Sequence, residues 1–388
     1  MRHGILSVLI ATISAFMTPV AADTLQTRLQ NVLTGFHEKY GFPGATAAIA
    51  SPDGLIVTAA IGVSDREAGT PMTPDTPMLA ASIGKSFVAM AVLALEDDGL
   101  LSADDPVARY LGEREWFGRL PNHDTMTLRD LLHHGSGLPD HVYLATFQAE
   151  MRARTATGGA AMRPEEAISF VLGADPLFPA GSGWAYSDTG YLLLGLVIEE
   201  VSGRSFYDLV GSRFLVPLSL DQTAPSDRPD LPGLAIGYVA NDNPFGLPPR
   251  TADDAGRLLW DPGMEWTGGG FLSTSRDLAI WGHALFEGEA MKEPYLDRLL
   301  DAVPVSQDAP GIFYGTGIAI YTTTPRGPVY GHGGWIPGYV SSLRHYADHG
   351  VTVAFQINTD VGSTDLVPAL EAALADLAIG NVDRRENQ

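Results

Sequence analysis

Segments with the composition of β-strands lie near both ends of the chain, and a long stretch of mainly helical pattern separates them. Near the start, residues 45–50 and 55–63 are small, β-branched and apolar, and Pro52-Asp53-Gly54 between them is typical of a hairpin turn. Three later segments share this composition: 329–335, 339–346 and 351–358. We therefore expect an α+β fold, in which one antiparallel sheet is built from both chain ends, is flanked by helices, and carries a mostly helical inserted subdomain.

Apolar residues at helical spacing predict a helix at residues 25–40, before the first predicted strand, and another at 365–379, after the last one. We expect one domain after the first 22 residues. Its α/β part comprises about 23–80 and 265–380, and its helical part comprises about 81–264.

The helical part contains two stretches with little periodicity. Residues 140–161 are polar and small, and 226–261 are rich in Pro, Asp and Gly, so we expect surface loops near a cleft in both places. Trp184, Trp335 and Tyr339 are candidates for cleft walls, with aromatic core as the alternative.

Composition excludes several classes of function. The 388 residues contain no cysteine and carry a formal net charge of -22, which opposes binding of nucleic acid. Without cysteine, disulfides, thiol catalysis and Cys-ligated metal sites are excluded. His133-His134 lacks a further ligand at metal spacing, so we expect no metal and no cofactor. The expected partner is a small-molecule or peptide substrate, and the oligomeric state stays open.

Residues 1–22 have the pattern of an export signal. A short positive start precedes the apolar stretch 5–17, and Val20-Ala21-Ala22 offers small residues for cleavage. The apolar stretch is short for a membrane span, and an uncleaved N-terminal anchor is the alternative. We expect an exported, periplasmic or secreted protein, whose domain at 23–388 has no stable membrane span after signal removal.

Ser82-Ile83-Gly84-Lys85 places a hydroxyl and an amine one helical turn apart, ahead of a long apolar run. A hydroxyl is a poor nucleophile at its free pKa and needs an adjacent base, which Lys85 can supply. At the start of a buried helix, free N–H groups and the helix dipole favour developing negative charge. The pair also occurs by chance in many helices, so its weight depends on the motifs found later in the chain.

Four further motifs stand downstream in order: Thr127-Leu128-Arg129-Asp130-Leu131-Leu132-His133-His134-Gly135-Ser136-Gly137-Leu138-Pro139, then Tyr186-Ser187-Asp188, Gly268-Gly269-Gly270 with Arg276-Asp277-Leu278, and His332-Gly333-Gly334. Over roughly nine-tenths of the mature chain, this series resembles the serine β-lactamase and penicillin-binding superfamily. The branch in question contains class C β-lactamases, D-Ala-D-Ala carboxypeptidases, D-aminopeptidases and esterases. No Gly-x-Ser-x-Gly elbow is present, which disfavours an α/β-hydrolase.

The resemblance implies a β-lactamase/transpeptidase-like fold and a serine hydrolase that cleaves an amide or ester through an acyl-enzyme on Ser82. The general base is either Lys85 or the phenolate of Tyr186, and the sequence leaves both open. By the same resemblance, the backbone N–H groups of Ser82 and Trp335 form the oxyanion hole. Adjacent acids at Glu165-Glu166 are interpreted as helix N-terminal charge rather than as a deacylating base.

Tyr186-Ser187-Asp188 corresponds to the second catalytic motif of the family, after Ser82-Ile83-Gly84-Lys85, and one of its residues departs from the commonest family pattern. Asp188 stands where Asn is usual, so a carboxylate replaces an amide beside Lys85. This anion would stabilise the charged form of Lys85 and so favour Tyr186 as the base. Asp188 would also attract a substrate N–H group or ammonium.

His332-Gly333-Gly334 corresponds to the third catalytic motif of the family, and it departs from the usual pattern as well. His332 replaces the usual Lys, and Gly333 stands where β-lactamases carry a hydroxyl residue, so two carboxylate-binding groups are missing. His332 is expected to polarise or protonate near the leaving group or the substrate tail. We therefore expect D-Ala-D-Ala carboxypeptidase-like, D-aminopeptidase-like or esterase activity. The alternatives are a β-lactamase, or a catalytically weak penicillin-binding-like protein that binds its ligand, with Asp188 as the lesion.

Overall fold

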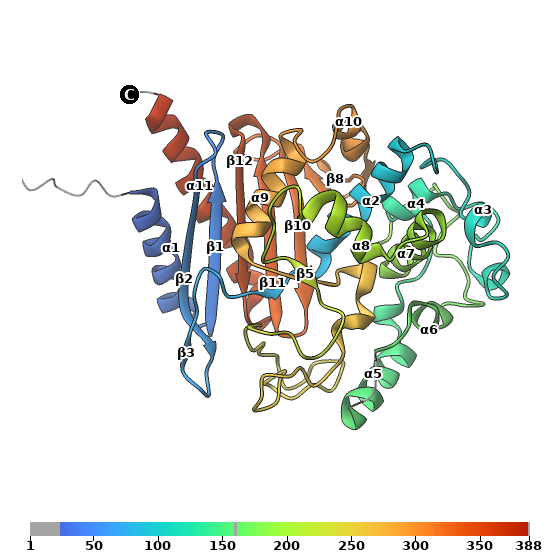
Figure 1. Cartoon of the computed structure of the whole chain (residues 1–388), viewed down its shortest axis with the longest axis horizontal. Coiled ribbons are helices and arrows are strands. Elements are labelled where there is room, and N and C mark those ends of the chain that lie inside the picture. Colours follow the sequence, from blue (N-terminus) through green and yellow to red (C-terminus); the bar gives the residue numbers. More distant parts are fainter. Residues whose placement is uncertain (1–23, 159–160, 387–388) are drawn as a thin grey trace, which may run out of the picture.

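The computed structural model describes residues 24–158 and 161–386, and the predicted export signal lies outside them. Its centre is a nine-stranded antiparallel sheet whose strands come from the two ends of the chain (Figure 1). The strands are β1 (Gly44–Ala50), β2 (Ile56–Asp65), β3 (Thr70–Pro71), β7 (Val303–Pro304), β8 (Ile312–Tyr314), β9 (Ala319–Tyr321), β10 (Val329–Ile336), β11 (Tyr339–Tyr346) and β12 (Val351–Ile357). Their order is β3-β2-β1-β12-β11-β10-β9-β8-β7, which confirms the predicted α+β fold.

Helices cover both faces of this sheet. Helices α1 (Leu25–Tyr40) and α11 (Ser363–Glu386) lie on one face, and α9 (Ser275–Phe286) lies on the other (Figure 1). Neighbouring residues of β1 show the alternation, because Ile49 joins the core under α1 and α11 whereas Ala48 joins the core under α9. Every residue of β1 is therefore buried, as expected for a strand covered on both sides.

Residues 81–264 contain the remaining helices apart from α10 (Tyr295–Leu300). They are α2 (Lys85–Asp97), α3 (Ala108–Leu111), α4 (Leu128–Leu132), α5 (Ala145–Thr157), α6 (Pro164–Ser169), α7 (Asp188–Ser202) and α8 (Phe206–Val210). A small second sheet joins β4 (Met78–Leu79), β6 (Phe271–Ser273) and β5 (Ala224–Pro225). Helices α2 and α7 are buried over most of their length and pack against each other. Across the described ranges, no helix combines the length and apolar character that crossing a membrane requires.

One predicted loop is a helix. Residues 145–157 form α5, which ends at Gly158 in a left-handed conformation, so the prediction of irregular structure at 140–161 was wrong there. The segment consists mainly of good helix formers, and only Phe147 and Met151, one turn apart, are buried. A helix that buries one narrow edge gives a weak periodic signal. The second predicted loop, 226–261, contains no helix or strand, and all of its residues are described.

Candidate active site

Ser82 lies on a short 3₁₀ turn, Ala81–Gly84, that leads directly into α2. Ala81 has a φ of 50°, which is unfavourable for a residue with a side chain and is often retained at functional sites. A Cβ atom at Gly334 would lie 2.4 Å from the carbonyl oxygen of Ala80, so only glycine lets β10 come this close to the turn. This approach sets Ser82 beside the end of β10.

Lys85, the first residue of α2, is fully buried and points its ammonium at three acceptors. It forms an ion pair with Asp188, donates to the carbonyl oxygen of Gly268, and donates to Ser82 Oγ at 3.3 Å. An ammonium has three N–H groups, and each has a partner here. The structure therefore places Lys85 as a hydrogen-bonded cation whose counter-ion is Asp188.

Tyr186 precedes α7 and places its ring 4.9 Å from Lys85 Nζ. Its hydroxyl is buried and has no hydrogen-bond partner among the described residues. Burial raises the pKa of the Tyr186 phenol well above its ordinary value, and the negative charge of Asp188 raises it further. The nearby Ser82 side chain lowers this pKa, but its effect is smaller. These effects oppose the resting phenolate that the sequence offered as one of two bases, and they leave a neutral phenol beside Ser82.

The signature at residues 127–139 positions the Tyr186 segment. Helix α4 begins with a capping box between Thr127 and Asp130, and the loop after it carries His134. His134 Nδ1 accepts a hydrogen bond from the backbone N–H of Ser187 at 3.1 Å, and its ring packs on Tyr186 with centroids 4.1 Å apart. Burial, and then the charge of Lys85, lowers the pKa of His134 well below the ordinary value. A neutral His134 thus orients the second motif.

Three carboxyl groups surround the Lys85 ammonium. Besides Asp188, burial raises the pKa of Asp140 to about 7 and that of Glu265 to about 8, and in both cases Asp188 is the next cause. The Asp140 Oδ1 atom accepts from the Val142 N–H at 3.1 Å, whereas its buried Oδ2 has no partner among the described residues. Within the same described ranges, no group of three or more His, Asp or Glu side chains is arranged to hold a metal ion.

His332 on β10 has both ring nitrogens engaged by the protein. Its Nδ1 contacts the carbonyl oxygen of Gly333, which only accepts, so Nδ1 carries the proton and Nε2 accepts from the Tyr314 hydroxyl at 2.9 Å. Burial, followed by the charge of Lys85, lowers the pKa of His332 to about 3. His332 is therefore a neutral, fully bonded ring, which differs from its expected role as a proton donor near the leaving group.

Ser82 and Tyr186 open onto a cavity of about 420 Å³. Its polar lining includes Asp188, Glu265 and His332, and no Lys or Arg is among the described residues that line it. Most of the wall is apolar: Val142, Phe147, Met151, Phe245, Leu247, Trp260, Met264, Trp335, Ile336, Pro337 and Val340. Such a lining suits an apolar group and offers no fixed cation to a substrate carboxylate.

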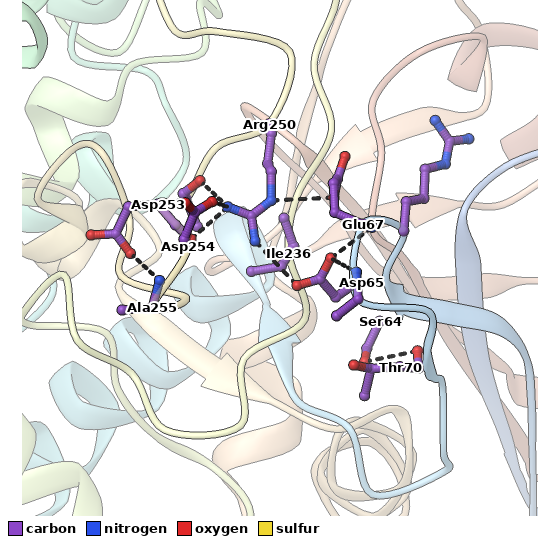
Figure 2. Close-up of polar contacts among 12 residues, drawn as sticks. Ser64, Asp65, Glu67, Thr70, Ile236, Arg250, Asp253, Asp254 and Ala255 are labelled. Atoms are coloured by element: carbon purple, nitrogen blue, oxygen red, sulfur yellow. Dashed lines mark hydrogen bonds and ion pairs between the residues drawn. The ribbon is translucent and has the colours of Figure 1, made fainter.

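The loop 226–261 forms one wall of the cavity and is tied down at two places. Figure 2 shows the Arg250 guanidinium between the loop and the β2–β3 hairpin, where it pairs with Asp65 at 3.1 Å and Glu67 at 3.2 Å. At the other side, Arg152 of α5 donates to the Pro244 carbonyl oxygen at 2.6 Å. Phe245 and Leu247, which line the cavity, lie between these two attachments.

The structure brings together the residues that the motifs predict and adds others. Ser82, Lys85, Tyr186, Asp188 and His332 meet at one end of the cavity. Trp335 lines the cavity with 44% of its surface exposed, whereas Tyr339 is in the core and Trp184 is outside the lining.

Sequence reasoning missed the roles of Asp140, Glu265, His134 and Tyr314. Asp140 directly follows the signature that ends at Pro139, and Glu265 stands three residues before Gly268, so proximity to motifs was the available signal. No sequence signal pointed to Tyr314, because it lies on a three-residue strand outside the motifs.

The fold and the site define a serine hydrolase with a Ser-x-x-Lys nucleophile and a Tyr-x-Asp second motif. The chain belongs to the Beta-lactamase family, whose model matches residues 29–377. It is 26% identical over 340 residues to penicillin-binding protein 4* of Bacillus subtilis, and the match covers 86% of this chain and 71% of that protein.

The chain is also similar to two D-stereospecific enzymes. A D-aminopeptidase of Cereibacter sphaeroides is 25% identical over 361 residues, so the match covers 91% of this chain but only 62% of the aminopeptidase. The crystal structure of a D-stereospecific amidohydrolase from Streptomyces sp. has a TM-score of 0.76 at 27% identity, and the match covers 89% of this chain and 98% of that chain.

Proposed function

We propose that the chain hydrolyses an amide or ester with an apolar acyl group, through an acyl-enzyme on Ser82. The observation that carries this proposal is the meeting of Ser82, Lys85 and Tyr186 at a large, mostly apolar cavity. The similarity to a D-aminopeptidase and to a D-stereospecific amidohydrolase supports an aminopeptidase-like, amidase-like or esterase activity.

The neutral Tyr186 phenol suggests how the proton of Ser82 moves. Because Lys85 donates to Ser82 Oγ, the serine hydroxyl is free to donate to the Tyr186 oxygen. As Ser82 Oγ attacks the carbonyl carbon, Tyr186 accepts that proton and passes its own to the leaving group, so no resting phenolate is required. The ammonium of Lys85 stabilises the transient negative charge, and water then releases the acyl group by the reverse relay.

The oxyanion of the tetrahedral intermediate is placed by the same proposal at the backbone N–H groups of Ser82 and Trp335. Strand β9 pairs with β10 only at residues 329–331, so the later part of β10 has no second partner strand among the described residues. That edge lies beside the Ser82 turn.

The charge of the cavity argues against substrates that carry a carboxylate. With His332 neutral and no Lys or Arg among the described lining residues, a β-lactam carboxylate or the C-terminus of a D-Ala-D-Ala peptide would face Asp188 and Glu265 without a compensating cation. We therefore place β-lactamase and D-Ala-D-Ala carboxypeptidase activities below the hydrolysis of uncharged or cationic substrates.

Active-site labelling tests the nucleophile. A fluorescent phosphonate should label the full chain, and Ser82→Ala should abolish the label, whereas the exposed Ser169→Ala should keep it. Turnover is compared on p-nitrophenyl esters, D-aminoacyl amides, D-Ala-D-Ala peptides and a chromogenic cephalosporin. A label that survives in Ser82→Ala, or a protein without label and without turnover on the panel, would contradict the proposal.

We also propose that the chain is exported, on the strength of the pattern at residues 1–22. Expression of the full chain in a Gram-negative host, followed by fractionation and N-terminal sequencing, should yield a periplasmic protein that begins at Asp23. A protein retained in the cytoplasm with residues 1–22 intact would contradict it.

A further inference from the structure

Glu265 is an acidic residue of the cavity for which neither the motifs nor the proposed mechanism has a use. It lies between the turns Pro262–Met264 and Trp266–Gly268, directly ahead of the Gly268-Gly269-Gly270 motif. Its side chain lines the cavity, yet no hydrogen bond or ion pair from the described residues reaches its carboxyl group. A carboxyl group in this position is costly unless a partner arrives from outside the protein.

The geometry around Gly268 brings Glu265 close to the reacting groups. A Cβ atom at position 268 would lie 3.7 Å from Asp188 Oδ1 and 3.7 Å from Glu265 Oε2, so a group as small as an ammonium can approach both carboxyls. Asp188 in turn is paired with Lys85, which is 3.3 Å from Ser82 Oγ. The two carboxyls are thus connected to the nucleophile through Gly268 and the Lys85–Asp188 ion pair.

The charges that face Glu265 leave it without compensation. Asp188 and Asp140 are negative neighbours, and the Tyr207 phenol faces it from α8. Among the described residues, the cation that acts on it is Lys85, whose ammonium is already paired with Asp188 and bonded to two further oxygens. Lys85 therefore does not hold Glu265 in its charged form, and an ammonium that enters the cavity would favour ionisation of the Glu265 carboxyl and bind it.

We propose that Glu265, together with Asp188, binds a free ammonium on the acyl group of the substrate. The substrate class is then an amide or ester of an amino acid with an apolar side chain, in which the amino group is unblocked and lies one or two carbons from the scissile carbonyl. This assignment rests on the proposed acyl-serine mechanism. The apolar wall takes the side chain, and the two carboxyls determine whether the amino group is required.

A protection experiment tests the assignment on the full-length protein. The rate of Ser82 labelling by a fluorescent phosphonate is measured at about pH 7.5, close to the pKa of an α-amino group, with increasing phenylalanine amide of either configuration or with 3-phenylpropionamide. The two amides differ only in the amino group. In the wild type, one enantiomer of phenylalanine amide should protect at a concentration at least about tenfold lower than 3-phenylpropionamide does.

Glu265→Gln keeps the size of the side chain and removes its ability to ionise when an ammonium binds. We expect this variant to reduce the preference for the amino compound by about tenfold or more, because a hydrogen bond to a charged group is lost. Asp230→Asn is the matched control, since it removes a charge from an exposed position of the wall loop. It should retain the wild-type preference.

The outcomes separate the two proposals. Equal protection by the two amides in the wild type, or a preference that survives in Glu265→Gln, would overturn the ammonium assignment while Ser82 labelling still supports the hydrolase. Absence of Ser82-dependent labelling would instead overturn the proposed mechanism. Turnover of phenylalanine p-nitroanilide and 3-phenylpropionyl p-nitroanilide gives a second measure of the same preference, as a ratio of kcat/KM values.

Discussion

Asp188→Asn separates the structural role of the Lys85–Asp188 ion pair from its role in substrate choice. The substitution removes a negative charge and restores the amide that is usual in this family, with almost no change in volume. Lys85 is completely buried, so loss of its counter-ion leaves a cation with no compensating charge, whose acceptors are the Gly268 carbonyl, Ser82 Oγ and the new amide oxygen.

The size of the effect is set by two opposing contributions. Breaking a buried ion pair by removing one partner costs about 3–5 kcal/mol. The Asn oxygen still accepts a hydrogen bond from the ammonium, which returns about 1.5–3 kcal/mol. We expect a net loss of about 1–3 kcal/mol in the free energy of unfolding, and a fall of about 1–4 °C in Tm.

The kinetic consequence differs from the stability consequence. Because Asp188 raises the pKa of Tyr186 and of Glu265, the variant should lower both and shift the pH–rate profile to lower pH. The preference for an amino-bearing substrate should fall, since one of the two carboxyl groups proposed to bind the ammonium is gone. Thermal unfolding by circular dichroism measures the change in stability, and kcat/KM for the matched p-nitroanilides measures the change in substrate preference, with Asp230→Asn as control for both.

An Asp188→Asn variant with wild-type Tm, pH profile and substrate preference would refute the reasoning. It would mean that the carboxylate neither balances Lys85 nor contributes to the field of the cavity. A variant that loses stability but keeps its substrate preference would refute only the substrate role.

Three further predictions use single substitutions. The Glu265 carboxyl holds a proton in the folded protein up to a pKa of about 8 but loses it near pH 4.3 when unfolded, so it lowers stability as pH rises through this window. In paired urea titrations, the free energy of unfolding of Glu265→Gln should exceed that of the wild type by about 1–3 kcal/mol at about pH 9 and by little at about pH 4. An equal difference at both pH values would contradict this. Arg250→Gln removes the ion pairs that connect loop 226–261 to the β2–β3 hairpin, so KM for an apolar ester should rise about threefold or more while kcat changes less. An unchanged KM would show that these ion pairs do not hold the cavity wall in place. Gly334→Ala would place a Cβ 2.1 Å from Ser341 Oγ and should lower kcat about 100-fold. Gly35→Ala is the control, because a Cβ at Gly35 has nothing within 4 Å, and it should leave kcat unchanged. Similar kcat values for the two variants would argue against the close approach of β10 to the Ser82 turn.

The sheet was predictable because its strands carry their own local signals. The predicted strands at 329–335, 339–346 and 351–358 match β10, β11 and β12 to within one residue at either end, since small and β-branched residues are bounded by turns. Strands β7, β8 and β9 were not predicted. They have two or three residues each and pair only because β10 offers an edge, which is a tertiary cause that no local pattern records.

The site was predictable as far as its motifs extend. Ser82 and Lys85 share one turn of chain, and the Tyr186 and His332 motifs have their own recognisable letters. The state of these groups was not predictable, because it depends on burial and on neighbours distant in sequence. His332 is neutral because it is buried and lies near the charge of Lys85, and Tyr314 of β8 donates to its ring; Tyr186 is neutral because it is buried next to Asp188.

The departures from the family pattern lie in the two motifs that contain Asp188 and His332, and they act in one direction. Asp188 adds negative charge to the cavity and Glu265 adds a carboxyl that can ionise, while His332 and Gly333 remove a cation and a hydroxyl. Random loss of a catalytic function would be expected to strike the nucleophile and its partners as often as the surrounding residues, yet the Ser-x-x-Lys pair and the motif tyrosine are intact. A coordinated change of sign around preserved reacting groups is what an altered substrate charge requires. The same residues that argue against a carboxylate-bearing β-lactam therefore argue for a substrate that brings its own positive charge.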